Sequence, residues 1–499
     1  MSQSVPLLVG VAQETLRPEE TDRVPDPIES TRAVVRSAAD DAECTALIDR
    51  ADALHVVNMT TWRLKDPPST FAQALGMHPA IKEYTASGGN GPQWLVNRVA
   101  DNIAAGRCEI AVLTGCEAWN SAGRAFKAGI FNRTYAEKLE VPMVGISRPG
   151  RTDEENNHGA NLPISIYPLL ENALRAKEGL TLEQQRRNLG RFAETFSAVA
   201  AKNPYSWYPV ARTAEEALTP TKTNRMVGFP YTKFLTACPA DMAAALIMTT
   251  TDVARRLGVP EEKWVYLHGG QDAHDEWFVS NRPDLAHSPA IKAIVQDALS
   301  QANIGLDAIS FFDLYSCFPC MPRIACKALG IAENDPRPLT ITGGLPYFGG
   351  PGNNYVMHSI AQAVNRCRAN PEEYGMITGN GMYCTKHAVG IYSCRPPESP
   401  WRRISPEQFQ EAMALPDPLE VDLEPTGAFR VDSYTVLHDR EGEPETGILC
   451  GRTAQAKRAW AQISEGNREV LESMMKEEWV GRQGRITHRS GNTNIVEFS

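Results

Sequence analysis

The chain has 499 residues, of which 42% are hydrophobic and 22% are charged, and its formal net charge at pH 7 is −10. This composition is that of a globular protein long enough for roughly two to four domains. The acidic balance argues against a broad nucleic-acid interface, which requires clustered Lys and Arg, but it is compatible with a local basic pocket for a phosphorylated ligand.

The beginning of the chain, MSQSVPLLVGVAQ, has no basic segment ahead of an apolar one, so it does not resemble a secretory signal. No apolar run in the sequence approaches the ~20 residues that span a bilayer. The 11 cysteines are an odd number scattered along the chain, which favours reduced thiols. We therefore expect a cytoplasmic protein without a membrane span.

The N-terminal part begins with an apolar strand predicted at Leu7–Ala12. Residues 87–115 then combine a glycine-rich turn, an amphipathic helix with Pro92 in its first turn, and an apolar strand at Ile110–Thr114 that ends in Thr-Gly. One face of the helix carries apolar residues four positions apart: Leu95, Val99 and Ile103. The stretch at about 119–230 is rich in aromatics, Pro and Arg and alternates poorly, so we expect an irregular loop region that carries ligand contacts.

Beyond this region, strands are predicted at Trp264–Leu267 and Ile309–Leu314. Residues 348–379 repeat the earlier pattern of glycine-rich turn, helix and strand, and the strand at Tyr374–Thr378 again ends in Thr-Gly. The apolar face of this second helix comprises Val356, Ile360 and Val364, and its N-cap is expected at Asn353 or Asn354. Glycine turns before a helix and a strand are common in α/β proteins, but the shared Gly-Gly and Thr-Gly ends favour a duplicated unit.

A proline-rich break at Cys394–Trp401, CRPPESPW, predicts a domain boundary. After it, strands are predicted at Phe429–Leu437, Ile448–Cys450 and Ile495–Phe498, with a helix near Asn467–Glu477. Short strands of this kind are typical of a small β-rich barrel.

Several segments are similar to those of one known family, the thiolases. CPADMAAALIMTTTDVARRLGV resembles the segment that closes the N-terminal thiolase half, and GGNGPQWLVNRVADNIAAGRCEIAVLTGCEAW resembles the nucleophile helix with its following strand. DLYSCFP is similar to the His-Asp-Cys-Phe turn of sterol-carrier-protein-type thiolases, and TGGLPYFGGPGNN is similar to the Gly-His-Pro loop. The resemblance covers residues of about 5–395, and the additional tail makes the chain most similar to type-1 thiolase-like proteins.

The resemblance implies an α/β fold of five layers, built from two βαβαβαββ halves, with a loop domain that holds CoA. The implied domains are an N-terminal half at 1–260, including the loop domain at about 119–230, a C-terminal half at 261–396, and an additional β-rich, OB-like domain at 403–499. Thiolases commonly form dimers or tetramers, and the additional domain could block such contacts. Both a homodimer and a monomer are therefore compatible with the sequence.

The family's chemistry uses three groups that this sequence lacks. The turn of the nucleophilic cysteine reads Thr85-Ala86-Ser87-Gly88, Gly350 replaces the histidine of Gly-His-Pro, and Ile377 replaces the late catalytic cysteine. A thiolate at a helix N-terminus is stabilised by the helix dipole, whereas a hydroxyl needs a neighbouring base, which the sequence does not identify. Capping of the helix by Ser87 is the simpler interpretation. We therefore do not expect Claisen condensation by the usual route.

Other residues could supply the chemistry. Tyr315 stands at the histidine position of the His-Asp-Cys-Phe turn, which resembles the thiolase-like aldolases of steroid side-chain breakdown, and a tyrosine there could act as a general acid. The further candidates are His387 as a proton carrier, Cys317 and Cys384 as thiol nucleophiles, and Ser87 as an alcohol. Buried structural roles are the alternative for each of them. The candidate substrate or oxyanion loop comprises Gly349, Gly350, Asn353 and Asn380.

Three functional hypotheses follow from the resemblance. The first is an acyl-CoA-handling enzyme, similar to acetyl-CoA acetyltransferases, that transfers an acyl group or cleaves a carbon–carbon bond of a CoA thioester. The second is a retro-aldolase that acts on a β-hydroxyacyl-CoA through Tyr315, and the third is a catalytically silent acyl-CoA-binding or scaffold protein. No metal and no cofactor besides the CoA thioester substrate are expected, because the glycine turns match no nucleotide-binding fingerprint. Basic residues that could meet the CoA phosphates are Arg98, Arg124, Lys127, Arg212 and Lys233.

Overall fold

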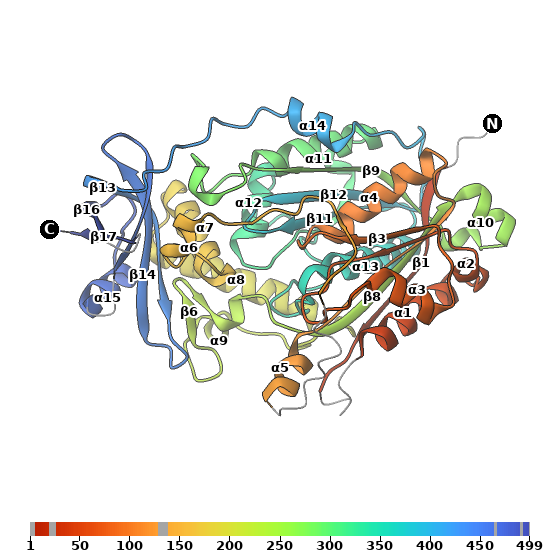
Figure 1. Ribbon diagram of the computed structural model, residues 1–499, viewed down its shortest axis with the longest axis horizontal. Helices are drawn as coiled ribbons and strands as arrows, with labels where there is room; N and C mark the ends of the chain where they lie inside the picture. The colour runs from red at the N-terminus through yellow and green to blue at the C-terminus, as the bar shows by residue number, and fades with distance from the viewer. Residues whose placement is uncertain (1–4, 19–25, 128–137, 464–466, 490–492, 499) are drawn as a thin grey trace.

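The computed structural model describes residues 5–18, 26–127, 138–463, 467–489 and 493–498. Most of the chain forms alternating layers of helices and sheets, and the C-terminal part forms a barrel at one end of this body (Figure 1). A long connection that carries the short helix α14 (Pro406–Ala412) runs across the body to the barrel. The predicted five-layered α/β fold is confirmed.

The first half of the body is a mixed sheet with helices on its outer face. Its strands, in spatial order, are β3 (Ile81–Thr85), β2 (Ala53–Val56), β4 (Ile110–Ala118), β8 (Asp241–Thr250) and β1 (Pro6–Thr15). The outer helices are α1 (Pro27–Asp41), α2 (Ala46–Asp49), α3 (Pro67–Leu75) and α10 (Thr251–Leu257). Strands β2, β3 and β4 are parallel, whereas β8 runs antiparallel to β1 and β4. Every residue of β4 and β8 is buried, which agrees with the continuous apolar pattern of central strands.

The second half repeats this arrangement with one irregular strand. Its regular strands, in spatial order, are β9 (Val265–His274), β12 (Lys386–Ser393), β11 (Tyr374–Gly381) and β10 (Ile309–Asp313), and its outer helices are α11 (Pro289–Ala302) and α12 (Cys320–Leu329). At the position of the missing strand, the segment at 338–339 accepts backbone hydrogen bonds from Phe312 and Leu314 at 2.8 and 3.0 Å. Pro338 lacks an N–H group and cannot donate within a ladder, so this segment does not continue as a regular strand.

The two repeated helices form the layer between the sheets. These helices, α4 (Gly91–Ala104) and α13 (Tyr355–Ala369), pack against each other and contact strands of both halves. The two predicted apolar stripes are at most 1% exposed: Leu95, Val99, Ile103, Val356, Ile360 and Val364. The two sheets also meet edge to edge, where β1 pairs with β9 at Leu7 with Tyr266 and Leu8 with Val265.

The predicted loop region at about 119–230 is largely helical, so the prediction of irregular structure was wrong. It contains α5 (Trp119–Lys127), α6 (Asp153–Asn157), α7 (Pro163–Lys177), α8 (Leu182–Ala200), α9 (Ala214–Leu218) and the short strands β5 (Met143–Val144), β6 (Met226–Gly228) and β7 (Tyr231–Thr232). At the start of α8, the Thr181 hydroxyl accepts from the backbone N–H of Gln184, whose side chain accepts from the Thr181 N–H. This capping box is visible in the sequence as Thr-x-x-Gln and was the missed signal.

In the part that the structure describes, the C-terminal barrel contains five strands and one helix. They are β13 (Thr426–His438), β14 (Pro444–Thr453), β15 (Arg458–Ile463), α15 (Arg468–Lys476), β16 (Gln483–Arg489) and β17 (Thr493–Glu497). The strand order β14-β15-β17-β16-β13 closes through the pairing of β13 with β14. Strand β6 of the body extends this sheet beside β13, so the barrel is joined to the body by backbone pairing. No helix in the described ranges has the length and hydrophobicity needed to cross a bilayer.

Candidate functional site

The turn between β3 and α4 stands where the thiolase nucleophile was expected. The buried hydroxyl of Thr85 accepts a hydrogen bond from the backbone N–H of Asn58 at 2.9 Å. Ser87 donates its hydroxyl to the side-chain oxygen of Asn353 at 3.3 Å, and the Gly88 N–H donates to the same oxygen at 2.9 Å. Ser87 is therefore not a helix cap, because α4 begins after Asn90 and Ser87 is instead tied to the second half of the body.

The loop at 349–354 stands where the thiolase Gly-His-Pro sequence was expected. The Gly350 N–H donates to the carbonyl of Cys238 at 2.6 Å and is therefore not available to an oxyanion. Asn353 donates its amide to the carbonyl of Asn58 at 3.0 Å, and Asn354 donates its amide to the carbonyl of Gly115 at 2.8 Å. Asn354 is the N-cap residue of α13, as the sequence predicts, but its side chain makes no capping hydrogen bond, and both asparagine side chains join the two halves of the body instead.

Tyr315 and the two candidate thiols lie behind the glycine turn. A Cβ atom placed on Gly89 would lie 2.2 Å from the Tyr315 hydroxyl, so this oxygen lies against the backbone that leads into α4. Burial raises the pKa of Cys317 and the pKa of Cys384 to about 12, so both are thiols at neutral pH. Burial and the adjacent Cys317 raise the pKa of Tyr315 well above its usual value. These groups are proton donors and not anions at neutral pH.

Asn380 lies beside the same cluster. Its amide donates to the Tyr167 hydroxyl at 2.9 Å, and this hydroxyl donates to the carbonyl of Met382 at 2.9 Å. Among the residues that the structure describes, the buried Asn380 side-chain oxygen has no hydrogen-bond partner. An unsatisfied buried acceptor is unfavourable, which makes Asn380 one of the polar groups through which a ligand could be recognised.

His387 is bound to an acidic partner. Its Nε2 atom lies 3.0 Å from Oδ2 of Asp275, which also accepts from the Ser288 hydroxyl at 2.5 Å. Burial acts to raise the pKa of Asp275, but the hydrogen bond and charge of His387 outweigh it and hold that pKa below its usual value. The remaining oxygen of Asp275 accepts from the Ala290 N–H at 2.9 Å. Both carboxylate oxygens of Asp275 therefore have partners within the protein, and Asp275 links His387 to the start of α11.

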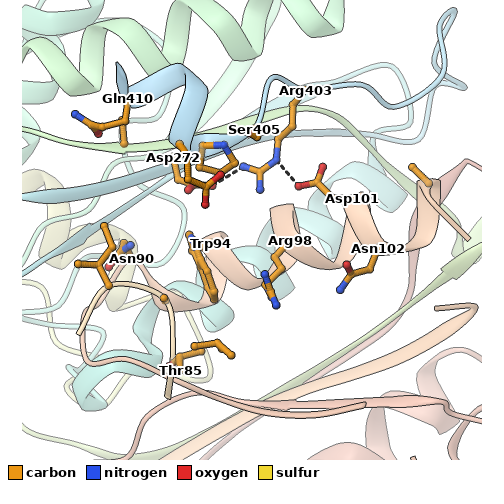
Figure 2. Close-up of a pocket in the computed structure, with 18 of the residues that line it drawn as sticks. Thr85, Asn90, Trp94, Arg98, Asp101, Asn102, Asp272, Arg403, Ser405 and Gln410 are labelled. Carbon is orange, nitrogen blue, oxygen red and sulfur yellow. Dashed lines mark hydrogen bonds and ion pairs between the residues drawn. The ribbon is translucent and has the colours of Figure 1, made fainter. Parts of the chain in front are cut away.

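A cavity of about 1390 Å³ opens beside the turn of Thr85. It lies between α4, the ends of β9 and β12, residues 144–146 and the connection at 400–411, which we call the strap. Figure 2 shows the side chains of Trp94, Arg98, Asp101 and Asn102 along α4, of which Asp101 points toward the strap residue Arg403. Of the predicted catalytic candidates, His387 lines this cavity. Tyr315, Asn380 and His387 line a separate void of about 10 Å³, close to the space of one water molecule.

The strap is held over the cavity by ionic contacts. Arg403 donates to Asp101 of α4 at 2.7 Å and to Asp272 of β9 at 2.5 Å, as the dashed lines in Figure 2 mark. Trp401 donates its indole N–H to Asp101 at 2.8 Å. The Arg403 side chain is 2% exposed, so the wall that the strap contributes is tied to both the central helix and the second sheet.

Lys386 is a polar group that sequence reasoning did not place among the site residues. It lines the large cavity, is 6% exposed, and donates from Nζ to the carbonyls of Ser87 at 2.5 Å and Ile146 at 3.4 Å. Burial lowers the pKa of Lys386 to about 8. The available signal was a lysine within the otherwise apolar strand sequence KHAVGIYS, where successive side chains point to opposite faces.

The comparisons with known proteins agree with the fold of the body and with the presence of the additional C-terminal barrel. The model of the thiolase-like protein type 1 additional C-terminal domain matches residues 408–490. The crystal structure of a monomeric SCP2-thiolase-like protein type 1 from Mycobacterium smegmatis is 32% identical, with a TM-score of 0.85 over 99% of this chain and 99% of that chain. The chain belongs to the SCP2-thiolase-like protein type 1 family.

More distant structures share the fold of this thiolase-like protein. The Ltp2-ChsH2(DUF35) aldolase is 16% identical, with a TM-score of 0.58 over 78% of this chain and 97% of that chain. An acetyl-CoA acetyltransferase from Syntrophomonas wolfei is 13% identical, with a TM-score of 0.58 over 79% of this chain and 100% of that chain. At these identities the likeness concerns the fold, and the chemistry must be argued from the site.

The basic residues expected near CoA differ in their surroundings in this thiolase-like protein. Arg98 lines the cavity but pairs with Glu83 at 2.7 Å, and Arg212 lies over the ring of Phe234 at 3.8 Å. The side chains of Arg124 and Lys127 lie outside the described residues. Two further arginines, Arg107 and Arg402, line the cavity and are exposed. A phosphate at the cavity mouth would therefore meet these two residues more readily than Arg212.

Proposed function

We propose that this thiolase-like protein binds an acyl-CoA and cleaves the bond between the α and β carbons of a β-hydroxyacyl thioester, with Tyr315 as the proton donor. The supporting observation is the absence of a usable thiolate: Thr85, Gly350 and Ile377 replace the family's catalytic groups, and both neighbouring thiols remain protonated. Acyl transfer through a cysteine thioester requires the anion that this environment disfavours.

A retro-aldol step matches the groups that are present. The β-hydroxyl loses its proton to water and becomes the C=O group of a released aldehyde or ketone as the α–β bond breaks. The electron pair of that bond forms the thioester enolate, which takes up a proton at the α carbon to give the shortened acyl-CoA. The Tyr315 hydroxyl, held in its neutral form, can donate a hydrogen bond to the enolate oxygen. Its position at the backbone leading into α4 adds the positive end of the helix dipole to that stabilisation.

A catalytically silent acyl-CoA-binding protein is the second candidate. The observation in its favour is that Tyr315 lines the void of about 10 Å³ and not the large cavity. A thioester bound in the large cavity would reach Tyr315 only after the turn at Gly89 moves. Binding without turnover is the expected behaviour if that turn stays fixed.

We further propose that the protein acts as a monomer. The edge strand β3, which otherwise offers unpaired backbone groups, is covered by β5 through the pairs Tyr84 with Met143 and Thr85 with Val144. The similar protein from Mycobacterium smegmatis is described as monomeric. Light scattering at micromolar concentration tests this, and a dimer mass would contradict it.

The test of the proposed function is the Tyr315→Phe variant. We expect it to lower kcat for release of acyl-CoA from a 3-hydroxyacyl-CoA by ~10²–10⁴-fold, the usual contribution of a positioned acid, with little change in binding. Tyr434→Phe removes a tyrosine hydroxyl in the barrel and serves as the matched control. Turnover is followed by chromatography of CoA esters, and binding by the thermal shift that a native-state ligand produces.

The outcomes separate the two candidates. Turnover that Tyr315→Phe leaves unchanged rejects the role of Tyr315. A thermal shift with acyl-CoA but no product with any 3-hydroxyacyl-CoA supports the silent binder. Absence of a shift with CoA, acetyl-CoA and longer esters contradicts both.

A further inference from the structure

Lys386 faces the large cavity without an acidic partner. Strand β12 places Lys386 and His387 on opposite faces of the sheet, so His387 meets Asp275 while Lys386 turns toward the start of α4. In the described part of the chain, its hydrogen-bond acceptors are the two carbonyl oxygens of Ser87 and Ile146, and no carboxylate is paired with it. A buried ammonium normally has a carboxylate partner, so this arrangement favours the uncharged amine.

Two glycines make room for this side chain. A Cβ atom on Gly88 would lie 2.9 Å from Nζ and 2.8 Å from Cε of Lys386, and a Cβ atom on Gly381 would lie 3.2 Å from Cε. A side chain at Gly88 would require the amine or the Asn90 side chain to shift, and one at Gly381 would press on both. The two glycines therefore leave space for the Lys386 side chain.

An unsatisfied acceptor borders the same turn as the amine. The side-chain oxygen of Asn90 would be 2.5 Å from the same Cβ position on Gly88 and 2.4 Å from a Cβ atom on Gly381, so it adjoins the same two glycines as the Lys386 side chain. This oxygen is buried and has no hydrogen-bond partner within the described ranges, and Asn90, which is 7% exposed, lines the cavity. A buried acceptor of this kind is expected to be satisfied by a ligand group that donates a proton.

We propose that Lys386 is a carbonyl-reactive amine that condenses with an aldehyde or ketone held in the large cavity. The indole rings of Trp94 and Trp401 line the same cavity and favour a substrate whose carbonyl carries an apolar or aromatic group. This activity goes beyond the proposed carbon–carbon cleavage, since neither CoA nor Tyr315 takes part in it.

The step is balanced without an oxidant or reductant. The Nζ lone pair attacks the carbonyl carbon, a C–N bond forms, and the carbonyl oxygen takes up a proton to give a carbinolamine. The nitrogen then loses its proton and the hydroxyl leaves as water, which yields an imine. In this proposal, the Asn90 oxygen, which borders the same turn, accepts a hydrogen bond from the carbinolamine hydroxyl or N–H. The lowered pKa of Lys386 supplies the neutral amine that this attack requires.

Reductive trapping tests the proposal. The full-length protein is incubated with benzaldehyde and cyanoborohydride at pH 7.5, and benzylated lysines are quantified by peptide mass spectrometry. Lys82 and Lys327, which lie on the surface, are internal references in the same sample. We expect Lys386 to be labelled at least roughly tenfold faster than either, because a pKa near 8 leaves far more neutral amine than an ordinary lysine has.

Two controls make the result decisive. The preference for Lys386 should disappear when the protein is denatured before labelling, and in the native protein its rate should level off above a pH of about 8, while the references continue to rise. Labelling of Lys386 no faster than that of Lys82 and Lys327, or a preference that survives denaturation, overturns the proposal. The experiment contains no CoA ester, so its failure leaves the proposed retro-aldol function untouched.

Discussion

Lys386 keeps a cationic side chain at 6% exposure with two carbonyl oxygens as its acceptors. The shift of its pKa from 10.5 to about 8 corresponds to about 3 kcal/mol by which the fold disfavours the charged form. Proteins retain such unfavourable groups mainly where function needs them. A lysine kept only for stability would be expected to lie in surroundings that favour its charged form.

Lys386→Met is therefore expected to stabilise the protein at pH 7, by about 1–2 kcal/mol after allowing for two lost hydrogen bonds. Below pH 8 the lysine is charged in both states, and the folded state bears the burial penalty. Between pH 8 and 10.5 the folded state has released its proton while the unfolded state still holds it, so wild-type stability rises toward that of the variant. Urea unfolding at pH 7 and at pH 10 measures both effects.

The control is Lys82→Met, which changes an exposed lysine and should shift stability by no more than about 0.5 kcal/mol at either pH. A Lys386→Met protein that is less stable at pH 7, with the same difference at pH 10, would mean that the amine serves the fold.

At the scale of elements, the sequence predicts the duplicated unit and the helices and strands whose hydrophobic residues are regularly spaced. The stripe Leu95, Val99, Ile103 on α4 identifies a buried helix because the period of four residues has one physical cause. The irregular segment at 338–339 and the helices of the 119–230 region were not predicted, because proline placement and short caps act locally and leave no long period.

The candidate site was predicted only in part, because it depends on contacts between distant segments. The sequence identifies the replaced positions Thr85 and Gly350, which follow from motif spacing. It does not reveal that Lys386 meets the carbonyl of Ser87, nearly three hundred residues earlier in the chain, or that residues of the strap line the cavity. Those neighbours exist only once the two halves have packed.

The strap gives the element-scale prediction. Arg403→Ala is expected to lower the free energy of unfolding by ~3 kcal/mol or more, because it leaves Asp272, which is 9% exposed on its side chain, without its partner. Hydrogen exchange of residues 400–411 should accelerate at the same time. Guanidinium unfolding and exchange mass spectrometry measure the two effects.

Arg402→Ala is the matched control, since Arg402 is the exposed neighbour in the same strap. It should change stability by no more than about 0.5 kcal/mol. Equal effects of the two variants would show that the ionic contacts of Arg403 do not hold the strap.

At the scale of the whole molecule, the barrel is fixed to the body by buried and part-buried polar contacts. Arg175 of α7 donates to Glu478 at 2.7 Å, Trp460 of β15 donates to the Ser280 hydroxyl at 2.9 Å, and Ser433 of β13 donates to the carbonyl of Leu169 at 2.6 Å. Together with the pairing of β6 and β13, these contacts make the barrel part of one folded unit. Its orientation on the body is therefore specified by hydrogen bonds as well as by apolar packing.

A further contact between the barrel and the body is expected to respond to pH. The backbone N–H of Asn494 in β17 of the barrel donates to Nε2 of His158 on the body at 2.8 Å, and the Asn494 amide donates to Glu154 of the body at 3.1 Å. His158 uses Nδ1 toward the Glu154 carbonyl at 2.8 Å, which fixes the neutral tautomer, and burial lowers the pKa of His158. Burial raises the pKa of Glu154 to about 7, although the Asn494 hydrogen bond and the nearby His488 act to lower it.

Because the folded-state pKa of Glu154 is raised from 4.5 to about 7, the folded protein holds a proton that the unfolded chain has lost over that interval. Stability should therefore fall as pH rises from about 4.5 to about 7, by at most about 3 kcal/mol, and stay level above it as far as this group is concerned. Glu154→Gln keeps an acceptor for Asn494 without titrating, so it should remove this slope and raise the melting temperature at pH 8. Glu469→Gln changes an exposed carboxylate of α15 and should retain the wild-type slope. The melting temperature of wild type and of Glu154→Gln is measured from pH 5 to pH 8. If both change with pH by the same amount, the contact between the barrel and α6 does not depend on this proton.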